Sequence, residues 1–346
     1  MLKRRAMGIP ARYALLWLCA VNACSSDHPH TQVPVVVTTV GAAGDGGAGG
    51  DGNGTPGDAG APGMPVLMGS PCNGWPALCA KQYDQVAIPV SHAAMANDAE
   101  VWSFPAQDQA LRQQLNDSMR GLWLEVRPYA GQAALCFGDC AAGHAPLVPA
   151  LGDVQGFLTD NPREVVTLLV DNYVPASDIA AALKAAKLTP FLYTEDSPDP
   201  WPTLADMIDH DMRLVVFLRD ANGAPNGYRA FDALIQQTSA TAETAHELSC
   251  DLTQGATGAP FVLFNQFVVQ ATDGGDMEAG VPAAQARPNP ELAATVALDP
   301  ELTQRLTRCV KFLGQKPNFV AVDFYDKSDV VSATQRLNGL IPPLTE

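Results

Sequence analysis

The chain contains 346 residues, 47% of them hydrophobic, with 21 basic and 37 acidic residues and a net charge of −16 at pH 7. This length accommodates one large domain or two ordinary ones. A negative field repels nucleic acid and anionic surfaces, so nucleic acid is excluded as a partner and an anionic membrane surface is disfavoured.

Residues 1–23 have the composition of a secretory signal peptide. They carry four basic residues and no acidic one, and their apolar run, residues 13–21, is shorter than the ~20 residues of a membrane-spanning helix. The segment Val21-Asn-Ala-Cys24 resembles the bacterial lipobox, in which the cysteine is lipidated and becomes the mature N-terminus. The sequence predicts an exported protein, either a cell-envelope lipoprotein that contacts the membrane through a lipid on Cys24 or a plainly secreted protein.

Residues 24–70 are predicted to form a disordered tether. Eleven of the 23 residues from position 41 to position 63 are glycine, and the rest of that stretch is mainly Ala, Asp and Pro. Such a segment buries too little apolar surface to offset its chain entropy. The remaining residues, 71–346, suit a single α/β barrel of about 250 residues.

Six cysteines follow Cys24, and an even number in an oxidising compartment indicates disulfides. Six cysteines allow 15 pairings. Sequence proximity favours Cys72 with Cys79, Cys136 with Cys140, and Cys250 with Cys309. A zinc site is the alternative, but the spacings form no paired C-x-x-C motif.

From residue 72 onward, short apolar runs alternate with helical periodicity, which predicts parallel strands joined by crossover helices. Strands are expected at residues 86–90, 121–126, 133–137, 165–170, 213–218, 261–269 and 318–325, with a weaker candidate at 190–193. Helices are expected at residues 107–119, 154–159, 177–186, 204–208, 228–236 and 291–313, the last broken at Pro300. A doubly wound open sheet would show a similar pattern, although no glycine-rich phosphate loop follows a strand.

Four segments place a polar residue at the end of an apolar stretch, where α/β barrels build their active sites. They are Pro89-Val-Ser-His-Ala-Ala-Met95, Leu122-Trp-Leu-Glu-Val126, Leu135-Cys-Phe-Gly-Asp-Cys140 and Leu168-Leu-Val-Asp-Asn-Tyr173. With further blocks between residues 72 and 340, such as Asn265-Gln-Phe267, they resemble the X domain of phosphatidylinositol-specific phospholipases C. The resemblance implies a (β/α)8 TIM-barrel fold of the PLC-like phosphodiesterase type.

The same resemblance implies site residues. His92 stands at the position of the family's first catalytic histidine, Glu125 and Asp171 match two acidic ligands of a Ca²⁺ ion, and Arg127 flanks them. The position of the second histidine is occupied by Phe137, which cannot transfer a proton. The asparagine after the first histidine is replaced by Ala93, and an acidic position two residues before Glu125 is replaced by Trp123.

Other side chains are expected near this site or have a purely structural alternative. Asp323 ends the predicted last strand and is expected to orient His92, while Trp123 and Tyr325 are candidates for lining a ligand cleft. Glu125 has the alternative of a buried ion pair with Arg127 or Arg120, and Asp171 has a similar alternative. Asp139 and His144 follow Phe137 but are better explained as turn and loop residues.

The resemblance predicts a phosphodiesterase that acts on a phospholipid head group or a related polyol phosphodiester, with His92 as the acid or base. The alternative is a catalytically degenerate barrel that serves as a ligand-binding lipoprotein on the cell surface. A metal-dependent glycerophosphodiesterase on the same barrel would need more clustered acids. A monomer is expected.

Overall fold

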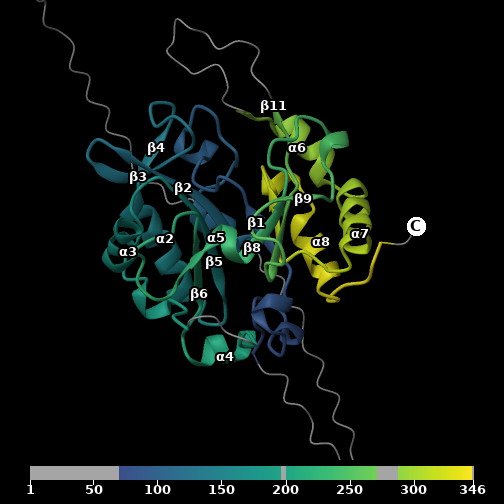
Figure 1. The fold of residues 1–346 in the computed structure, drawn as a ribbon, viewed down its shortest axis with the longest axis horizontal. Coiled ribbons are helices and arrows are strands. Elements are labelled where there is room, and N and C mark those ends of the chain that lie inside the picture. The colour runs from purple at the N-terminus through teal and green to yellow at the C-terminus, as the bar shows by residue number, and fades with distance from the viewer. Residues whose placement is uncertain (1–69, 196–199, 271–286, 345–346) are drawn as a thin grey trace, which may run out of the picture. The chain divides into compact units, whose positions relative to one another are not determined.

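A computed structural model describes residues 70–195, 200–270 and 287–344. Within these ranges, eight strands run parallel in one curved sheet (Figure 1). They are β1 (Ile88–Ser91), β2 (Gly121–Tyr129), β5 (Val166–Asn172), β6 (Leu214–Leu218), β7 (Tyr228–Ala230), β8 (Ile235–Thr238), β10 (Phe261–Asn265) and β13 (Phe319–Val322). The predicted signal peptide, Cys24 and the predicted tether up to residue 69 lie outside the described residues.

The parallel strands follow the spatial order β7-β6-β5-β2-β1-β13-β10-β8. The first strand, β1, pairs with β2 on one side and with the last strand, β13, on the other. Among the described parallel strands, β7 pairs only with β6 and β8 only with β10, so the barrel is open between β7 and β8. The predicted barrel-type α/β fold is confirmed.

Alternate residues of the strands fill the barrel interior. Phe217 of β6 contacts Phe261 of β10 and Phe319 of β13 at ring-centroid distances of 5.6 and 6.0 Å, although these strands are not neighbours of β6 in the sheet. The residues before and after Phe217, Val216 and Leu218, pack in a separate cluster with the outer helices. Because side chains alternate along a strand, the interior residues share one parity in each strand.

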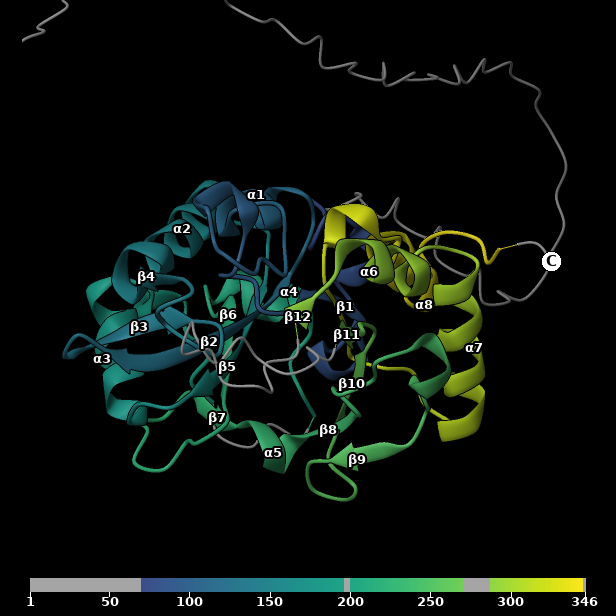
Figure 2. The same ribbon diagram turned by 90° about the horizontal axis from the view of Figure 1, so that it is seen from above.

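The described residues form eight α-helices, most of which cover the outer face of the sheet (Figures 1 and 2). They are α1 (Leu111–Asn116), α2 (Leu147–Asp160), α3 (Ala176–Ala185), α4 (Leu204–Asp209), α5 (Phe231–Leu234), α6 (Pro290–Ala297), α7 (Glu301–Leu313) and α8 (Val330–Leu337). Thr203 and Asp206 form a capping box that starts α4, and Pro300 separates α6 from α7 as expected. None of the helices in the described ranges is long and apolar enough to cross a membrane.

Three element predictions are wrong. Strand β3 (Gln132–Cys136) runs antiparallel to both β2 and β4 (His144–Pro146), so the segment predicted as a barrel strand is a hairpin on the rim. The candidate strand at 190–193 begins in a short 3-10 turn, η4 (Thr189–Phe191). The helix predicted at 228–236 is divided into β7, α5 and β8, because buried Arg229 donates to the carbonyls of Tyr193 and Gly227 and holds β7 extended beside β6.

The three predicted disulfides are confirmed. Cys72 pairs with Cys79 before β1, and Cys136 pairs with Cys140 at the end of β3. The third bond joins Cys250, which precedes β9 (Leu252–Gln254), to Cys309 on α7. This last bond joins cysteines 59 residues apart and links the segment after β8 to the outer helical layer.

Candidate active site

His92 and Asp323 meet at the carboxyl ends of β1 and β13. Both continue the interior parity of their strands, after Ile88 and Val90 in β1 and after Phe319 and Ala321 in β13, so both point into the barrel mouth. His92 Nδ1 lies 2.8 Å from Asp323 Oδ1. A carboxylate accepts hydrogen bonds, so His92 donates through Nδ1–H and its Nε2 is left as the acceptor nitrogen.

Aromatic side chains hold the His92 ring. Phe267 stacks on it with ring centroids 4.0 Å apart and planes within 6°. Trp123 and Phe137 meet it edge-on, with centroids 5.1 and 5.9 Å away. The His92 side chain keeps 15% of its surface exposed, so the imidazole is fixed in orientation and still reaches solvent.

Burial governs the charge of Asp323. Its side chain is 1% exposed, and burial raises the pKa of the Asp323 carboxyl, while the charge and hydrogen bond of His92 lower it. Its second oxygen, Oδ2, has no hydrogen-bond partner among the described residues. The carboxylate is therefore directed at a single partner, the imidazole of His92.

Glu125 lies at the same mouth, and its carboxylate accepts hydrogen bonds from other groups of the protein. Its Oε1 accepts from Arg127 Nε at 2.5 Å and from the backbone N–H of Gly138 at 2.8 Å. The Arg127 guanidinium also stacks over Tyr173, 3.7 Å from the ring centroid. The ion pair with Arg127 that the sequence suggested for Glu125 is present, and it places a guanidinium at the rim.

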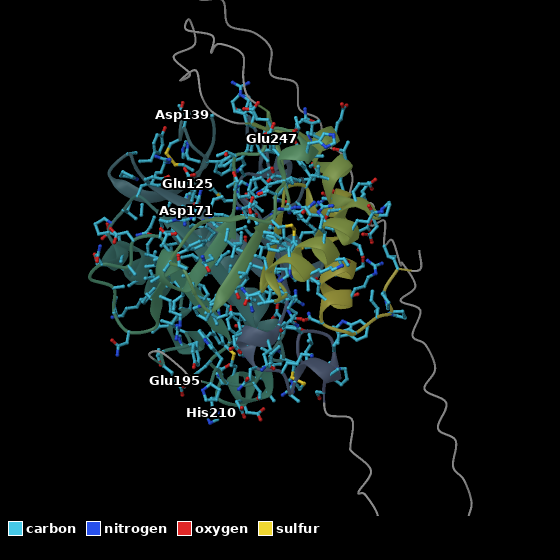
Figure 3. The ribbon with its side chains drawn as sticks, turned by 45° about the vertical axis from the view of Figure 1, so that its right-hand side comes forward. Glu125, Asp139, Asp171, Glu195, His210 and Glu247 are labelled. Carbon is cyan, nitrogen blue, oxygen red and sulfur yellow. A yellow bond between two sulfur atoms is a disulfide. The ribbon has the colours of Figure 1, made fainter. Side chains whose placement is uncertain are left out.

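Asp171 pairs in register with Glu125 across β2 and β5, and Figure 3 shows the two side chains close together near the rim. Its Oδ2 accepts from Trp123 Nε1 at 2.9 Å, and its Oδ1 accepts from Arg219 Nε at 2.8 Å. Arg219 also binds Asp232 at 2.5 Å. Each acid of the β2 and β5 pair therefore has its own arginine, which offsets the repulsion between two adjacent carboxylates.

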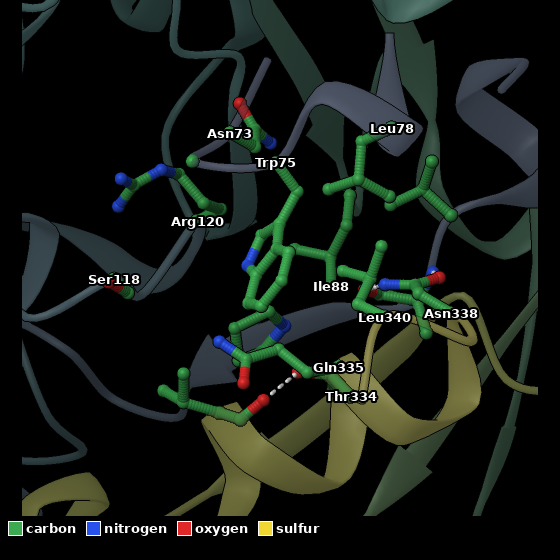
Figure 4. Close-up of a pocket in the computed structure, with 15 residues that line it drawn as sticks. Asn73, Trp75, Leu78, Ile88, Ser118, Arg120, Thr334, Gln335, Asn338 and Leu340 are labelled. Atoms are coloured by element: carbon green, nitrogen blue, oxygen red, sulfur yellow. Dashed lines mark hydrogen bonds between the residues drawn. The ribbon is translucent and has the colours of Figure 1, made fainter. Parts of the chain in front are cut away.

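An open pocket of about 770 Å³ lies beside this network at the carboxyl ends of the strands. Its lining includes Asp171, Tyr173, Arg219, Asp232 and Gln254. Another cavity, of about 90 Å³, lies at the amino end of β1, between Trp75, Ile88 and Leu340 (Figure 4). Of these two, the pocket at the carboxyl ends has the larger volume and is lined by charged groups of the mouth.

The sequence profile of the family described as PI-PLC X 1 matches residues 78–338. The chain belongs to the PI-PLC X family. Two structures of phosphatidylinositol-specific phospholipase C from Staphylococcus aureus share its fold. They superpose with TM-scores of 0.52 and 0.50 at 14% identity, covering 75% of this chain and 95% and 94% of theirs.

Two curated relatives come from a fungus and a plant. The chain is 25% identical over 273 residues to an uncharacterized secreted protein of Arthroderma benhamiae, which covers 75% of this chain and 61% of the relative. It is 25% identical over 268 residues to a PI-PLC X domain-containing protein of Arabidopsis thaliana, covering 72% and 59%. The match therefore spans about three fifths of each relative.

The remaining candidate residues of the PI-PLC X domain lie outside the His92 pair. Tyr325 is buried and its hydroxyl donates to Asp117, so it belongs to the packing around α8. Asp139 accepts from the backbone N–H of Ala141 within the rim loop. His144 faces Tyr129 and the carbonyl of Cys140, and therefore supplies no second imidazole beside His92.

Three further residues of the PI-PLC X domain contact the residues of this mouth and are not expected from the sequence. Arg219 follows Val215 and Phe217 at a spacing of two, so its side chain also points into the barrel. The strand predicted from the sequence ends at residue 218, one residue before it. Asp232 was placed within a predicted helix. Buried Gln107 donates to the carbonyls of His92 and Val322 and accepts from Tyr325 N–H, which locks the ends of β1 and β13 together.

The donor set at this mouth does not fit the Ca²⁺ ion that the resemblance suggested. Calcium takes 6 to 8 oxygen ligands. The Glu125 and Asp171 carboxylates are each bound to a guanidinium, and the described residues contain no group of three or more His, Cys, Asp or Glu suited to hold a metal. Arg127 and Arg219 supply the positive charge here instead.

Proposed function

We propose that the chain cleaves phosphodiesters that carry a neighbouring hydroxyl group, such as an inositol or polyol phosphodiester, with His92 as general base. The observation that supports this most directly is the His92–Asp323 hydrogen bond of 2.8 Å at the barrel mouth. A general base needs a ring nitrogen that is free to accept a proton, with the other ring nitrogen held by a partner, and the His92–Asp323 pair has this arrangement.

In the proposed reaction, His92 Nε2 accepts the proton of the substrate hydroxyl. The hydroxyl oxygen attacks the phosphorus and forms a cyclic phosphodiester, while the bond from phosphorus to the alcohol of the second ester breaks. Asp323 stabilises the imidazolium that forms. Arg127 and Arg219 offset the negative charge that develops on the phosphoryl oxygens.

Protonation of the departing alcohol is the difficult step for this site. Phe137 stands beside His92 where the resemblance places a second histidine, and a phenyl ring donates no proton. The proton for the alcohol therefore comes from water or from the His92 imidazolium itself. Substrates whose alcohol is a good leaving group are accordingly favoured.

A second proposal rests on the same residue. A chain that keeps the barrel and the pocket lined by Arg219 but lacks a second proton carrier is suited to bind a phosphorylated polyol without cleaving it. In both proposals the protein is exported, either to the cell envelope, where a lipid on Cys24 anchors it, or as a secreted protein.

Phosphorus NMR of the full chain incubated with phosphatidylinositol and with glycerophosphoinositol separates the proposals. A cyclic inositol phosphate that accumulates equally with calcium and with EDTA supports the phosphodiesterase. Saturable binding of inositol phosphate with no turnover supports the binding protein. If the chain shows no turnover and no binding, both proposals are refuted.

A further inference from the structure

Arg305 is a buried cation without a carboxylate partner among the described residues. Its side chain lies on α7 and is 4% exposed. Its nitrogens donate to the carbonyls of Leu248, Ser249 and Asn265, and to the side-chain oxygen of Gln266. All of these acceptors are neutral, and no ion pair of Arg305 occurs among the described residues. Burying a charge without a counter-charge is costly.

A second guanidinium increases this cost. Arg308 lies about one turn further along α7 and is exposed. Burial, followed by the charge of Arg308, lowers the pKa of Arg305 to about 10. The pair remains cationic at neutral pH, in a chain whose net charge is −16.

Both arginines line a pocket of about 210 Å³ between α6, α7 and η5 (Ala245–Glu247). His246 of η5 and Gln304 line it as well. Glu301 also faces it but makes no ion pair with either arginine within the described ranges. A water occupies about 30 Å³ of liquid, so this space holds one phosphate-sized ion with several waters.

We propose that this pocket binds a small oxyanion of the phosphate class, held by Arg308 and His246 in front of the buried charge of Arg305. The site is distinct from the mouth of the barrel and does not depend on the proposed catalysis. It adjoins the mouth through Gln266, which precedes the Phe267 ring that stacks on His92.

Calorimetric titration of the full chain with sodium phosphate, at constant ionic strength balanced with chloride, tests the site. Arg308→Gln is expected to weaken phosphate binding about tenfold or more, as the loss of a charge-assisted hydrogen bond does. Lys311→Gln is the matched control, because Lys311 is exposed on the same helix but does not line the pocket. His92→Ala is expected to retain the binding, which separates this site from the barrel mouth.

Co-sedimentation with phosphatidic acid vesicles distinguishes a lipid phosphate from a free ion. If the chain binds phosphate and Arg308→Gln weakens this binding, the pocket is assigned to a soluble anion. If the chain binds vesicles but not free phosphate, and Arg308→Gln weakens the vesicle binding whereas Lys311→Gln does not, the pocket is assigned to a lipid phosphate. Equal behaviour of Arg308→Gln and Lys311→Gln in both measurements, or no binding by the unmodified chain in either, would overturn the proposal.

Discussion

At the scale of single residues, the site depends on how Asp323 is buried. A raised pKa means that the folded chain binds the Asp323 proton more tightly than the unfolded chain does. This contribution to stability is complete in acid and is lost as the pH rises through the raised pKa. The protein therefore carries a destabilising charge at neutral pH in order to hold His92.

We predict that Asp323→Asn raises the free energy of unfolding at pH 7 and that this gain shrinks towards pH 4. The amide keeps an oxygen for His92 Nδ1–H but cannot ionise. Denaturant unfolding across this pH range is the measurement, and Asp209→Asn, at a side chain that is 67% exposed, is the control. A variant that is less stable than the unmodified chain at pH 7 would contradict the burial argument.

In the proposed reaction, Phe137 restricts the leaving groups that the site accepts. Its ring lies 5.9 Å from that of His92, so Phe137→His would place a second imidazole beside the first. We predict that this variant cleaves phosphodiesters of ordinary alcohols about 100-fold faster, the usual effect of general acid catalysis, and gains little on nitrophenyl esters. Phe137→Leu removes the ring without adding a proton carrier and should show no such gain; equal gains in both variants would exclude the leaving-group argument.

Much of this residue-level site was predictable from the order of residues alone. His92 and Asp323 each follow apolar interior residues at a spacing of two, and the family resemblance drew attention to His92, Glu125 and Asp171. The arginine partners were harder to predict. Arg219 reaches Asp171 from a different strand, so only the register of β5 and β6 brings them together.

At the scale of elements, the hairpin of β3 and β4 supports the site through one loop. The Cys136–Cys140 disulfide closes the loop that carries Phe137 and the Gly138 N–H bound to Glu125. Chain-entropy arguments assign about 2 kcal/mol to a disulfide over such a short loop and about 4 kcal/mol to Cys250–Cys309, which spans 59 residues. We therefore expect Cys250–Cys309 to contribute more to stability and Cys136–Cys140 to contribute more to function.

We predict that serine replacement of Cys250 and Cys309 lowers the free energy of unfolding about twice as much as serine replacement of Cys136 and Cys140. Only the second replacement should change phosphodiester turnover, because only that loop contacts Glu125 and His92. Unfolding curves and initial rates on both double variants test this. Turnover that falls equally in both would show that the hairpin has no specific role.

The elements that the sequence did not predict have weak local signals. Tyr228, Phe231 and Ile235 recur at helical spacing, yet β7 and β8 are short strands on either side of α5. Their extended form depends on pairing with β6 and β10, and the buried Arg229 contributes contacts to distant carbonyls. By contrast, β6 and the first five residues of β5 are almost entirely apolar and are buried on both faces, and the predicted ends of both strands lie within two residues of the observed ones.

At the scale of the whole molecule, the charge of −16 opposes approach to an anionic lipid surface. The Debye length falls from about 30 Å at 0.01 M salt to about 10 Å at 0.1 M. We predict that cleavage of phosphatidylinositol in vesicles speeds up over this range, whereas cleavage of soluble glycerophosphoinositol changes little. A vesicle rate that falls with salt would point to attraction by a local basic surface instead.

The proposed function requires that the imidazole of His92 performs the chemistry at the barrel mouth. Initial rates of glycerophosphoinositol cleavage by the full chain, His92→Ala and His210→Ala test it most directly, because His210 lies after α4, away from the rim (Figure 3). We expect His92→Ala to lose at least about 100-fold in rate and His210→Ala to retain the rate of the unmodified chain. Equal rates for all three proteins would exclude His92 as the general base.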